Sequence, residues 1–269
     1  MKTRIIVAIF IVFIATQTKA QLRVEPNTAF QRGEVLTYKV YYDAVLTGQV
    51  NAGNVVFSIK NENKLINNRS TLHIEAIGKT KGAFNWFYKV VDHYDTYVDE
   101  ETLAPWLFLR RIDEGGYIIN QDVTFNQNKN VAYFVDNKKN KQATITTPPY
   151  VQDLLSAIYY CRTYDVTKLG NNDEFFVKFM LDDTVYSTKI VYVGKETVST
   201  NFGKVRCLKL KPQVLTGTVF KDPYPVTLWV TDDKNKIPIL AESAIIVGKV
   251  KLELINYSGL KNAFSALIK

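Results

Sequence analysis

The chain has 269 residues, of which 34 are Lys or Arg, 26 are Asp or Glu, two are histidines and two are cysteines. The excess of positive charge is mild and the lysines are scattered among expected turns, so we expect no nucleic-acid partner. The 16 tyrosines and 15 phenylalanines favour β-strands, and the length provides ample material for a hydrophobic core.

The first 20 residues have the pattern of a secretory signal peptide. Lys2 and Arg4 precede an apolar run over residues 5–14, and Thr18-Lys19-Ala20 follows as an expected cleavage site. Cleavage after Ala20 leaves 31 basic and 26 acidic residues, a net charge of +5. No cysteine follows the cleavage site, and no later stretch is long enough to span a membrane as a helix. We therefore expect an exported periplasmic protein, free or associated with the outer membrane, that is not an integral membrane protein.

Residues 33–147 predict a meander of antiparallel strands. In the first strand, apolar or aromatic residues recur at every second position, at Leu36, Tyr38, Val40 and Tyr42. Further strands are expected at 49–60, 70–78, 84–99, 103–112, 117–125, 131–135 and 142–146. The run 84–99 is partly apolar on both sides, which predicts a central strand.

A helix is predicted over residues 148–164. Five apolar side chains fall on one side of a 3.6-residue period, at Val151, Leu154, Leu155, Ile158 and Tyr159. Thr147 is the expected N-cap and Pro148 the expected first helical residue. We expect the whole apolar side to be buried, so that a charge at Leu155 or Ile158 would unfold the protein.

The pattern of strands resumes over residues 173–257. A hairpin is expected from 174–181 and 185–193 around Asp182-Asp183, followed by strands at 204–212, 226–231, 237–247 and 250–257. Residues 258–269 are expected to form a short helix or a loose tail. About fourteen strands and one helix predict a single, mainly β domain over residues 21–269. Its architecture would be a large curved antiparallel sheet or incomplete β-barrel, with one amphipathic helix packed on or in it.

Three stretches together resemble a family of exported bacterial proteins, the domain-of-unknown-function family 3108 (DUF3108). They are GEVLTYKVYYDAVLTGQVNAG at 33–53, VVDHYDTYVDEETLAPWLFLRRIDEGGY at 90–117 and VQDLLSAIYYCR at 151–162. The family has no established activity, so the resemblance implies a fold and a compartment but no catalytic residue. It also implies a similarity in kind to half-barrel periplasmic carriers of lipids and lipoproteins, at the level of the fold alone.

Few side chains have the spacing of a catalytic or metal site. His93 and Asp95 share a strand face with Asp99 further along, and a metal site would need a third ligand such as His73. Ser156 lies inside the expected helix without the Gly-x-Ser-x-Gly turn of a hydrolase, and no Walker loop or dinucleotide fingerprint is present.

A glycosidase-like pair of carboxylates would require residues from a set of four to meet in space: Asp92, Asp99, Asp113 and Glu114. The more economical interpretation is that charged side chains hold the helix against the sheet through charge-assisted hydrogen bonds. The candidates for this role are Asp92, Asp99, Arg110, Arg111, Glu114, Asp153 and Arg162. We therefore predict no catalytic residue, no metal and no cofactor, and leave open whether the protein is an enzyme.

The two cysteines, Cys161 and Cys207, allow two interpretations. An exported location permits a disulfide that would link the helix to the second set of strands. The alternative is that both are free, buried thiols.

Six aromatic residues are the candidate ligand-binding residues: Tyr38, Tyr42, Trp86, Tyr88, Trp106 and Phe108. On the concave side of a curved sheet they would line an apolar groove for a lipid, an acyl chain or another hydrophobic ligand. The alternative is an ordinary packed core.

Three functions follow from these alternatives. A carrier of an apolar ligand predicts an unfilled, aromatic-lined cavity. An envelope interaction or structural protein, partnering an outer-membrane assembly, predicts a filled core and an exposed apolar patch. An enzyme predicts a cleft with converging carboxylates or histidine.

Overall fold

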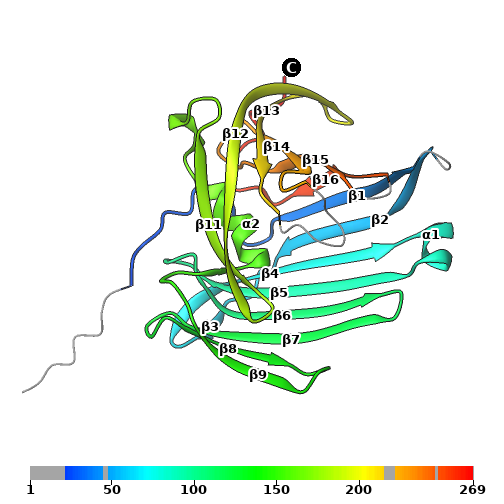
Figure 1. Ribbon diagram of the computed structural model, residues 1–269. Coiled ribbons are helices and arrows are strands. Elements are labelled where there is room, and N and C mark those ends of the chain that lie inside the picture. Colours follow the sequence, from blue (N-terminus) through cyan, green and yellow to red (C-terminus); the bar gives the residue numbers. More distant parts are fainter. Residues whose placement is uncertain (1–21, 45–47, 215–221, 246–247, 269) are drawn as a thin grey trace, which may run out of the picture.

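The computed structural model describes residues 22–44, 48–214, 222–245 and 248–268 (Figure 1). The expected signal peptide lies outside these residues. Within them, sixteen strands form one hydrogen-bonded sheet, accompanied by two α-helices and one short 3-10 helix. None of the helices in this part of the chain has the length and apolar character needed to cross a membrane.

The first nine strands follow one another as the sequence predicts, with one short strand in addition. They are β1 (Val35–Ala44), β2 (Gly48–Ile59), β3 (Lys64–Ile66), β4 (Arg69–Thr80), β5 (Val90–Asp99), β6 (Pro105–Glu114), β7 (Tyr117–Asn126), β8 (Val131–Asp136) and β9 (Lys141–Thr146). Asparagines occupy left-handed backbone positions in three of the turns, with φ of 53° at Asn67, 52° at Asn130 and 50° at Asn140. Asparagine tolerates this conformation better than most residues, so the chain reverses tightly at these points.

The remaining strands are one that directly precedes a short helical region and six that follow it. They are β10 (Gln152–Asp153), β11 (Glu174–Leu181), β12 (Thr184–Thr200), β13 (Gly203–Pro212), β14 (Val226–Thr231), β15 (Pro238–Ala244) and β16 (Lys249–Ser258). The helices are α1 (Gly82–Phe87), α2 (Leu154–Thr163) and the 3-10 helix η1 (Val166–Lys168). The predicted hairpin around Asp182-Asp183 is confirmed as β11 and β12, which pair antiparallel.

The sheet is strongly curved and open. Its strand order is β10-β11-β12-β13-β14-β15-β16-β1-β2-β4-β5-β6-β7-β8-β9, with β3 paired to β4. The pairings are antiparallel except for that of β10 with β11. Register shifts interrupt several of them, including both pairings of β1, and such bulges increase twist and bend a sheet. The two halves of the sheet therefore face each other across α2 (Figure 1), which confirms the predicted curved sheet with a helix packed in it.

The predicted strand over 84–99 is wrong in its first part. The β4–β5 pairing matches Lys79 with Val91, so the residues between them must reverse the chain. Gly82, with φ of 58°, begins this reversal, and α1 fills it. Only Val90–Asp99 is strand, as β5. The alternating aromatics of residues 84–88 resemble a strand locally, but the hairpin leaves them no partner strand.

Helix α2 begins later than predicted. Tyr150 has a φ of 57°, which a right-handed helix does not allow, so Thr147 and Pro148 are not its N-cap and first residue. Asp153 is the N-cap instead, and its Oδ1 accepts hydrogen bonds from the backbone N–H groups of Leu155 and Ser156, both at 2.8 Å. The Ser156 hydroxyl oxygen accepts from the Asp153 N–H at 2.8 Å and completes a capping box.

The hydrophobic core lies in three clusters. One joins α2 to β4–β8, a second joins α2 to β11–β14, and a third joins β1, β13 and β15–β16 to the end of the chain. In that end segment, residues 259–268 form no helix, but Ala266 is fully buried and Leu267 bridges to Val205. The segment is therefore packed against the sheet and not a loose tail.

Candidate functional site

Three apolar cavities adjoin α2 among the described residues. The largest, of about 440 Å³, lies between α2 and the second half of the sheet. A cavity of about 160 Å³ lies between α2 and the middle of the sheet, where β14–β16 meet β1 and β2, and one of about 210 Å³ lies between α2 and the first half. Ile158 lines all three cavities. It is 39 % exposed, so the prediction that the whole apolar side of the helix is buried is wrong. We call the three together the α2 cavities.

The walls of the largest cavity come from strand alternation. On β11, Val177, Phe179 and Leu181 face inward at every second position, and Ile190 does so on β12. A single ten-residue helix cannot fill the concave side of so many strands, so apolar surface remains uncovered beside it. The site is therefore a property of the curvature and not of a local motif.

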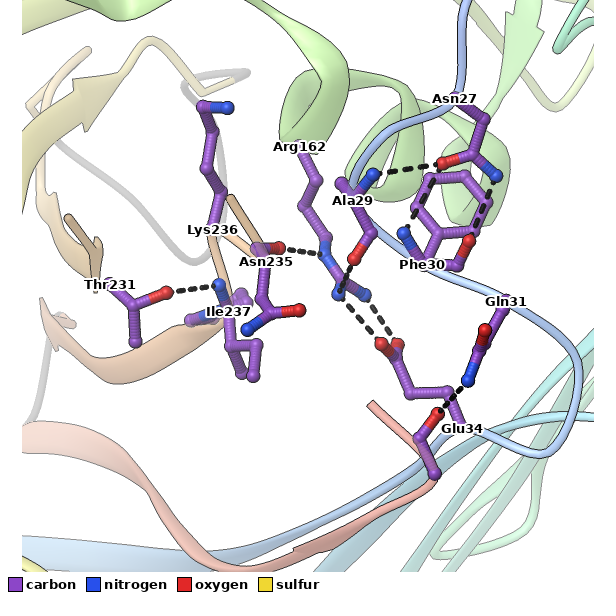
Figure 2. A network of polar contacts seen from close by, with 12 residues as sticks. Asn27, Ala29, Phe30, Gln31, Glu34, Arg162, Thr231, Asn235, Lys236 and Ile237 are labelled. Carbon is purple, nitrogen blue, oxygen red and sulfur yellow. Dashed lines mark hydrogen bonds and ion pairs between the residues drawn. The ribbon is translucent and has the colours of Figure 1, made fainter. Parts of the chain in front are cut away.

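A buried ion pair fixes the end of α2 within these cavities. The Arg162 guanidinium donates to both carboxylate oxygens of Glu34, at 2.5 Å and 2.8 Å, and to the carbonyls of Asn235 at 3.0 Å and Ala29 at 3.4 Å (Figure 2). Burial lowers the pKa of Arg162, but the bond to Glu34 outweighs it, so the pKa is raised and the charge is retained. The predicted role of Arg162 in holding the helix agrees with this geometry, whereas Glu34 was not foreseen.

The other predicted charged residues divide among separate contacts. Asp153 caps α2 and accepts a hydrogen bond from the Thr96 hydroxyl at 2.5 Å, which ties the helix to β5. Arg110 pairs with Asp182 of the β11–β12 turn and Arg111 with Asp122 of β7, so neither ion pair involves the helix. Asp99 accepts from Arg69 and from the Trp106 indole, within the first half of the sheet.

One carboxylate faces the 210 Å³ cavity. Asp92 lines it, and its Oδ1 is buried without a hydrogen-bond partner among the described residues. Burial, followed by the neighbouring Glu114 carboxylate, raises the pKa of Asp92 to about 7. Of the four carboxylates considered for a glycosidase, two come together, Asp92 and Glu114. Asp99 instead pairs with Arg69.

The six predicted aromatic residues do not line a common groove. Tyr38 lines the 160 Å³ cavity and its hydroxyl donates to the Pro238 carbonyl at 3.0 Å. Trp106 and Phe108 are buried in β6. The Tyr42 ring packs edge-on against Phe84 of α1, while Trp86 of α1 and the neighbouring Tyr88 are exposed. The α2 cavities are lined mainly by aliphatic residues. The sequence shows that these residues alternate along their strands, but it does not show that other side chains leave them uncovered.

Both histidines lie on the opposite, convex face of the sheet. His73 contacts Glu62 and Asp95, each at 2.7 Å, and His93 contacts Glu75 and Asp95, each at 3.2 Å. Burial lowers the pKa of His73, but its bonds to Asp95 and Glu62 raise it above the usual value. Glu75, His93 and Asp95 lie close enough together to share one metal ion.

The candidate ligand Asp99 is not part of this convex cluster, since it binds Arg69. Lys60 Nζ lies 2.6 Å from Glu75 and already neutralises that carboxylate. The cluster is therefore a network of polar contacts in which Lys60 supplies one positive charge.

The two cysteines are separate thiols. Cys161 lines the largest cavity, whereas Cys207 is buried in the cluster beneath β13. Burial raises the pKa of each thiol to about 12. The free-thiol alternative therefore holds, and neither cysteine has the thiolate character of a nucleophile.

These features define an open antiparallel β half-barrel with an internal helix and an apolar interior beside it. The chain belongs to the DUF3108 family, proteins of unknown function, whose family model matches residues 37–255. Among curated proteins, none matches the chain.

The fold also occurs in solved structures. A β-barrel-like protein of the family DUF1849 from Brucella abortus aligns with a TM-score of 0.55 and 11 % identity, over 86 % of this chain and 99 % of its own. A proposed exported protein with a YmcC-like fold from Bacteroides fragilis aligns with a TM-score of 0.31 and 14 % identity, over 88 % and 100 %. A proposed lipoprotein from Parabacteroides distasonis gives 0.32 and 12 %, over 88 % and 100 %. The first of these shows a shared fold.

Proposed function

We propose that this protein binds an apolar ligand, such as a lipid or an acyl chain, in the α2 cavities. The observation that supports the proposal most is the 440 Å³ cavity, whose volume falls in the range typical of small-molecule sites. Its lining is mainly aliphatic, and the exposed side of Ile158 joins it to the two smaller cavities. An elongated apolar molecule would gain binding energy by removing this surface from water.

The proposed place of this binding is the periplasm. The support is the signal-peptide pattern of residues 1–20, in which two basic residues precede an apolar run. Lipids need protein carriers in an aqueous compartment because their acyl chains are insoluble there. A carrier with an internal apolar site would suit that compartment.

The proposal is tested by native mass spectrometry with lipid extraction, on protein purified gently from the periplasm of its own host. Ile158→Trp would fill the junction of the three cavities. The matched control is Ile118→Trp on β7, because Ile118 is 38 % exposed and lines none of them. We expect a stoichiometric apolar adduct on the wild type and on Ile118→Trp, and its loss in Ile158→Trp. Wild-type protein without any adduct that also takes up no added lipid would contradict the proposal.

A second candidate function, contact with the cell envelope, is favoured by the surface of α1. Trp86 is 91 % exposed and Phe87 is 82 % exposed, with Tyr88 beside them. Residues 79–91 contain three lysines and no acidic residue. Exposed aromatics together with lysines suit the interface of an anionic lipid surface. Figure 1 shows α1 at the end of the strands, away from α2, so both functions could coexist.

The envelope contact is tested by sedimentation with phosphatidylglycerol vesicles. We expect the double substitution Trp86→Ala and Phe87→Ala to reduce vesicle binding. Phe176→Ala on β11, at a residue that is 60 % exposed, is the control and should leave binding unchanged. Equal binding by all three proteins would argue against the α1 surface.

A further inference from the structure

The 440 Å³ cavity, the largest of the α2 cavities, has an unbalanced charge. Among its polar and charged lining residues are two cations, Arg162 and Lys236, together with Thr188 and Gln213. Among the described residues that line it there is neither Asp nor Glu. A cavity that is otherwise apolar therefore presents positive charge only.

The two cations differ in how well they are satisfied. Arg162 is held by both oxygens of Glu34 and by backbone carbonyls, so it has little capacity left for a ligand. The Lys236 ammonium makes no hydrogen bond or ion pair of this kind with the described residues. In Figure 2 its side chain points away from the Arg162–Glu34 pair. Lys236 is therefore the cation that remains available at the cavity wall.

The backbone holds Lys236 in a fixed and unusual conformation. Its φ is 46°, in the left-handed region that residues other than glycine rarely adopt. Asp233 Oδ1 accepts hydrogen bonds from the Asn235 N–H at 3.0 Å and the Lys236 N–H at 3.3 Å, and the Thr231 hydroxyl oxygen accepts from the Ile237 N–H at 2.9 Å. Strain of this kind persists only where the surroundings enforce it, and it is concentrated at functional sites.

The Lys236 ammonium is partly withdrawn from water. Burial is the main effect on it and lowers its pKa, Arg162 acts in the same direction, and Asp165, Asp233 and Asp232 act in the opposite direction. A partly desolvated ammonium regains favourable interactions when an anion contacts it. At the other end of the α2 cavities, neither Lys nor Arg is among the described residues that line the 210 Å³ cavity, so an anionic head finds no cation there. The position of the Lys236 cation therefore sets the orientation of a charged ligand in the α2 cavities.

We propose that the ligand of the α2 cavities is an anionic amphiphile, whose carboxylate or phosphate head binds Lys236 while its apolar tail runs past Ile158. This inference rests on the proposed function and adds the class of the ligand and its orientation. The tail occupies the aliphatic part of the large cavity and extends toward the cavity that Asp92 lines.

The test compares three probes with the same chain, namely oleate, oleyl phosphate and oleyl alcohol, by calorimetric titration of the purified mature protein. The variants are Lys236→Met, which removes the charge, and Lys236→Arg, which retains it. Lys234→Met is the matched control, because Lys234 is exposed two residues away. Thermal melts establish that each variant is folded.

We expect at least one anion to bind the wild type more tightly than the alcohol, and the preferred anion identifies the head group. Lys236→Met should weaken binding of that anion roughly tenfold to a hundredfold, as expected for a charge-assisted hydrogen bond. Binding of the alcohol should not change, and Lys236→Arg and Lys234→Met should resemble the wild type.

Two results would overturn the inference in distinguishable ways. If the three probes bind equally well, or if Lys236→Met weakens the alcohol as much as the anions, the anionic head is wrong and the apolar site stands. If none of the probes binds the wild type, the proposed function is wrong and the inference falls with it.

Discussion

Arg162 and Glu34 are 128 positions apart in the chain, yet they form an ion pair whose side chains are 3 % and 0 % exposed. Removing one partner of such a pair leaves an uncompensated buried charge, which typically costs about 3–5 kcal/mol. We therefore expect Arg162→Met to lower the free energy of unfolding by about that amount, measured by urea denaturation. Lys138→Ala, at an exposed turn, is the control. A loss in Arg162→Met no larger than that in the control would contradict the assigned role.

Only one partner of this ion pair, Arg162, could be predicted from the sequence. Arg162 follows the apolar pattern of the helix, so a contact between its charge and the sheet was predictable. Glu34 precedes β1, in a segment with no period of its own, and its partner is set by the closure of the sheet. A contact of this range depends on the complete topology and cannot be read from local spacing.

Asp92 should give stability a specific pH dependence. An ordinary aspartate ionises near pH 3.8, whereas burial and the nearby Glu114 raise the pKa of folded Asp92 to about 7. Between these values the folded state holds a proton that the unfolded state has lost, so the free energy of unfolding falls as the pH rises. Asparagine does not ionise, so in Asp92→Asn the free energy of unfolding does not fall for this reason. We expect the variant to gain stability relative to the wild type from about pH 4 to about pH 7, measured by urea denaturation across that range.

Comparison of Asp92→Asn with the wild type separates the contribution of Asp92 from those of the other titratable residues. Asp153 has a pKa raised to about 6 by burial, and it contributes in the same direction in both proteins. Arg110 and Tyr94, which also act on the Asp92 region, are likewise common to both. A difference between wild type and variant that stays constant over the range would show that Asp92 ionises normally.

At the scale of elements, α2 has two sides with different roles. Leu155 is 3 % exposed in the core cluster and lines only the 210 Å³ cavity, while Ile158 is 39 % exposed and lines all three α2 cavities. We expect Leu155→Asp to unfold the protein, because it buries an unpaired charge. Ile158→Asp should remain folded and lose binding of apolar ligands. Circular dichroism and titration with oleyl alcohol measure the two effects, and unfolding of Ile158→Asp would show that this side is part of the core.

Strands were predictable where the period of two is continuous, as in β1 and in the β11–β12 hairpin. The start of α2 was not, because Gln152 and Asp153 pair with Phe179 and Met180 of a strand that comes later in the chain. Likewise, the aromatic pattern near α1 favours a strand. The β4–β5 pairing instead requires the chain to reverse there, and α1 forms within this reversal. The inward aliphatic positions were visible, but an empty space beside them depends on the curvature of the whole sheet.

At the scale of the molecule, polar contacts connect the two facing halves of the sheet. The turn between β11 and β12 reaches the first half, where Asp182 accepts from Arg110 at 3.1 Å and from Gln121 at 3.0 Å, and Asp183 pairs with Lys141. Asp182 is partly exposed, and exposed pairs contribute only about 0–1 kcal/mol each to stability. These contacts are therefore weak enough to open while the strands remain paired.

We expect the double substitution Asp182→Asn and Asp183→Asn to accelerate exchange of a bound ligand with little change in melting temperature. Loss of these charge-assisted contacts would let the halves separate more often. Stopped-flow displacement of a fluorescent fatty acid measures the rate, and high salt should accelerate wild-type release in the same way. Unchanged release in the double variant would show that ligands leave by another route.

The middle of the sheet pairs two strands that are far apart in the sequence, since Val35 of β1 lies opposite Ser258 of β16. During synthesis β1 is made long before β16, so the central pairing waits until the intervening strands have been made. Contacts so distant in sequence form slowly, and an unpaired strand edge is prone to aggregation in the meantime. The order of the strands therefore makes the pairing at the centre of the sheet the slowest one to form.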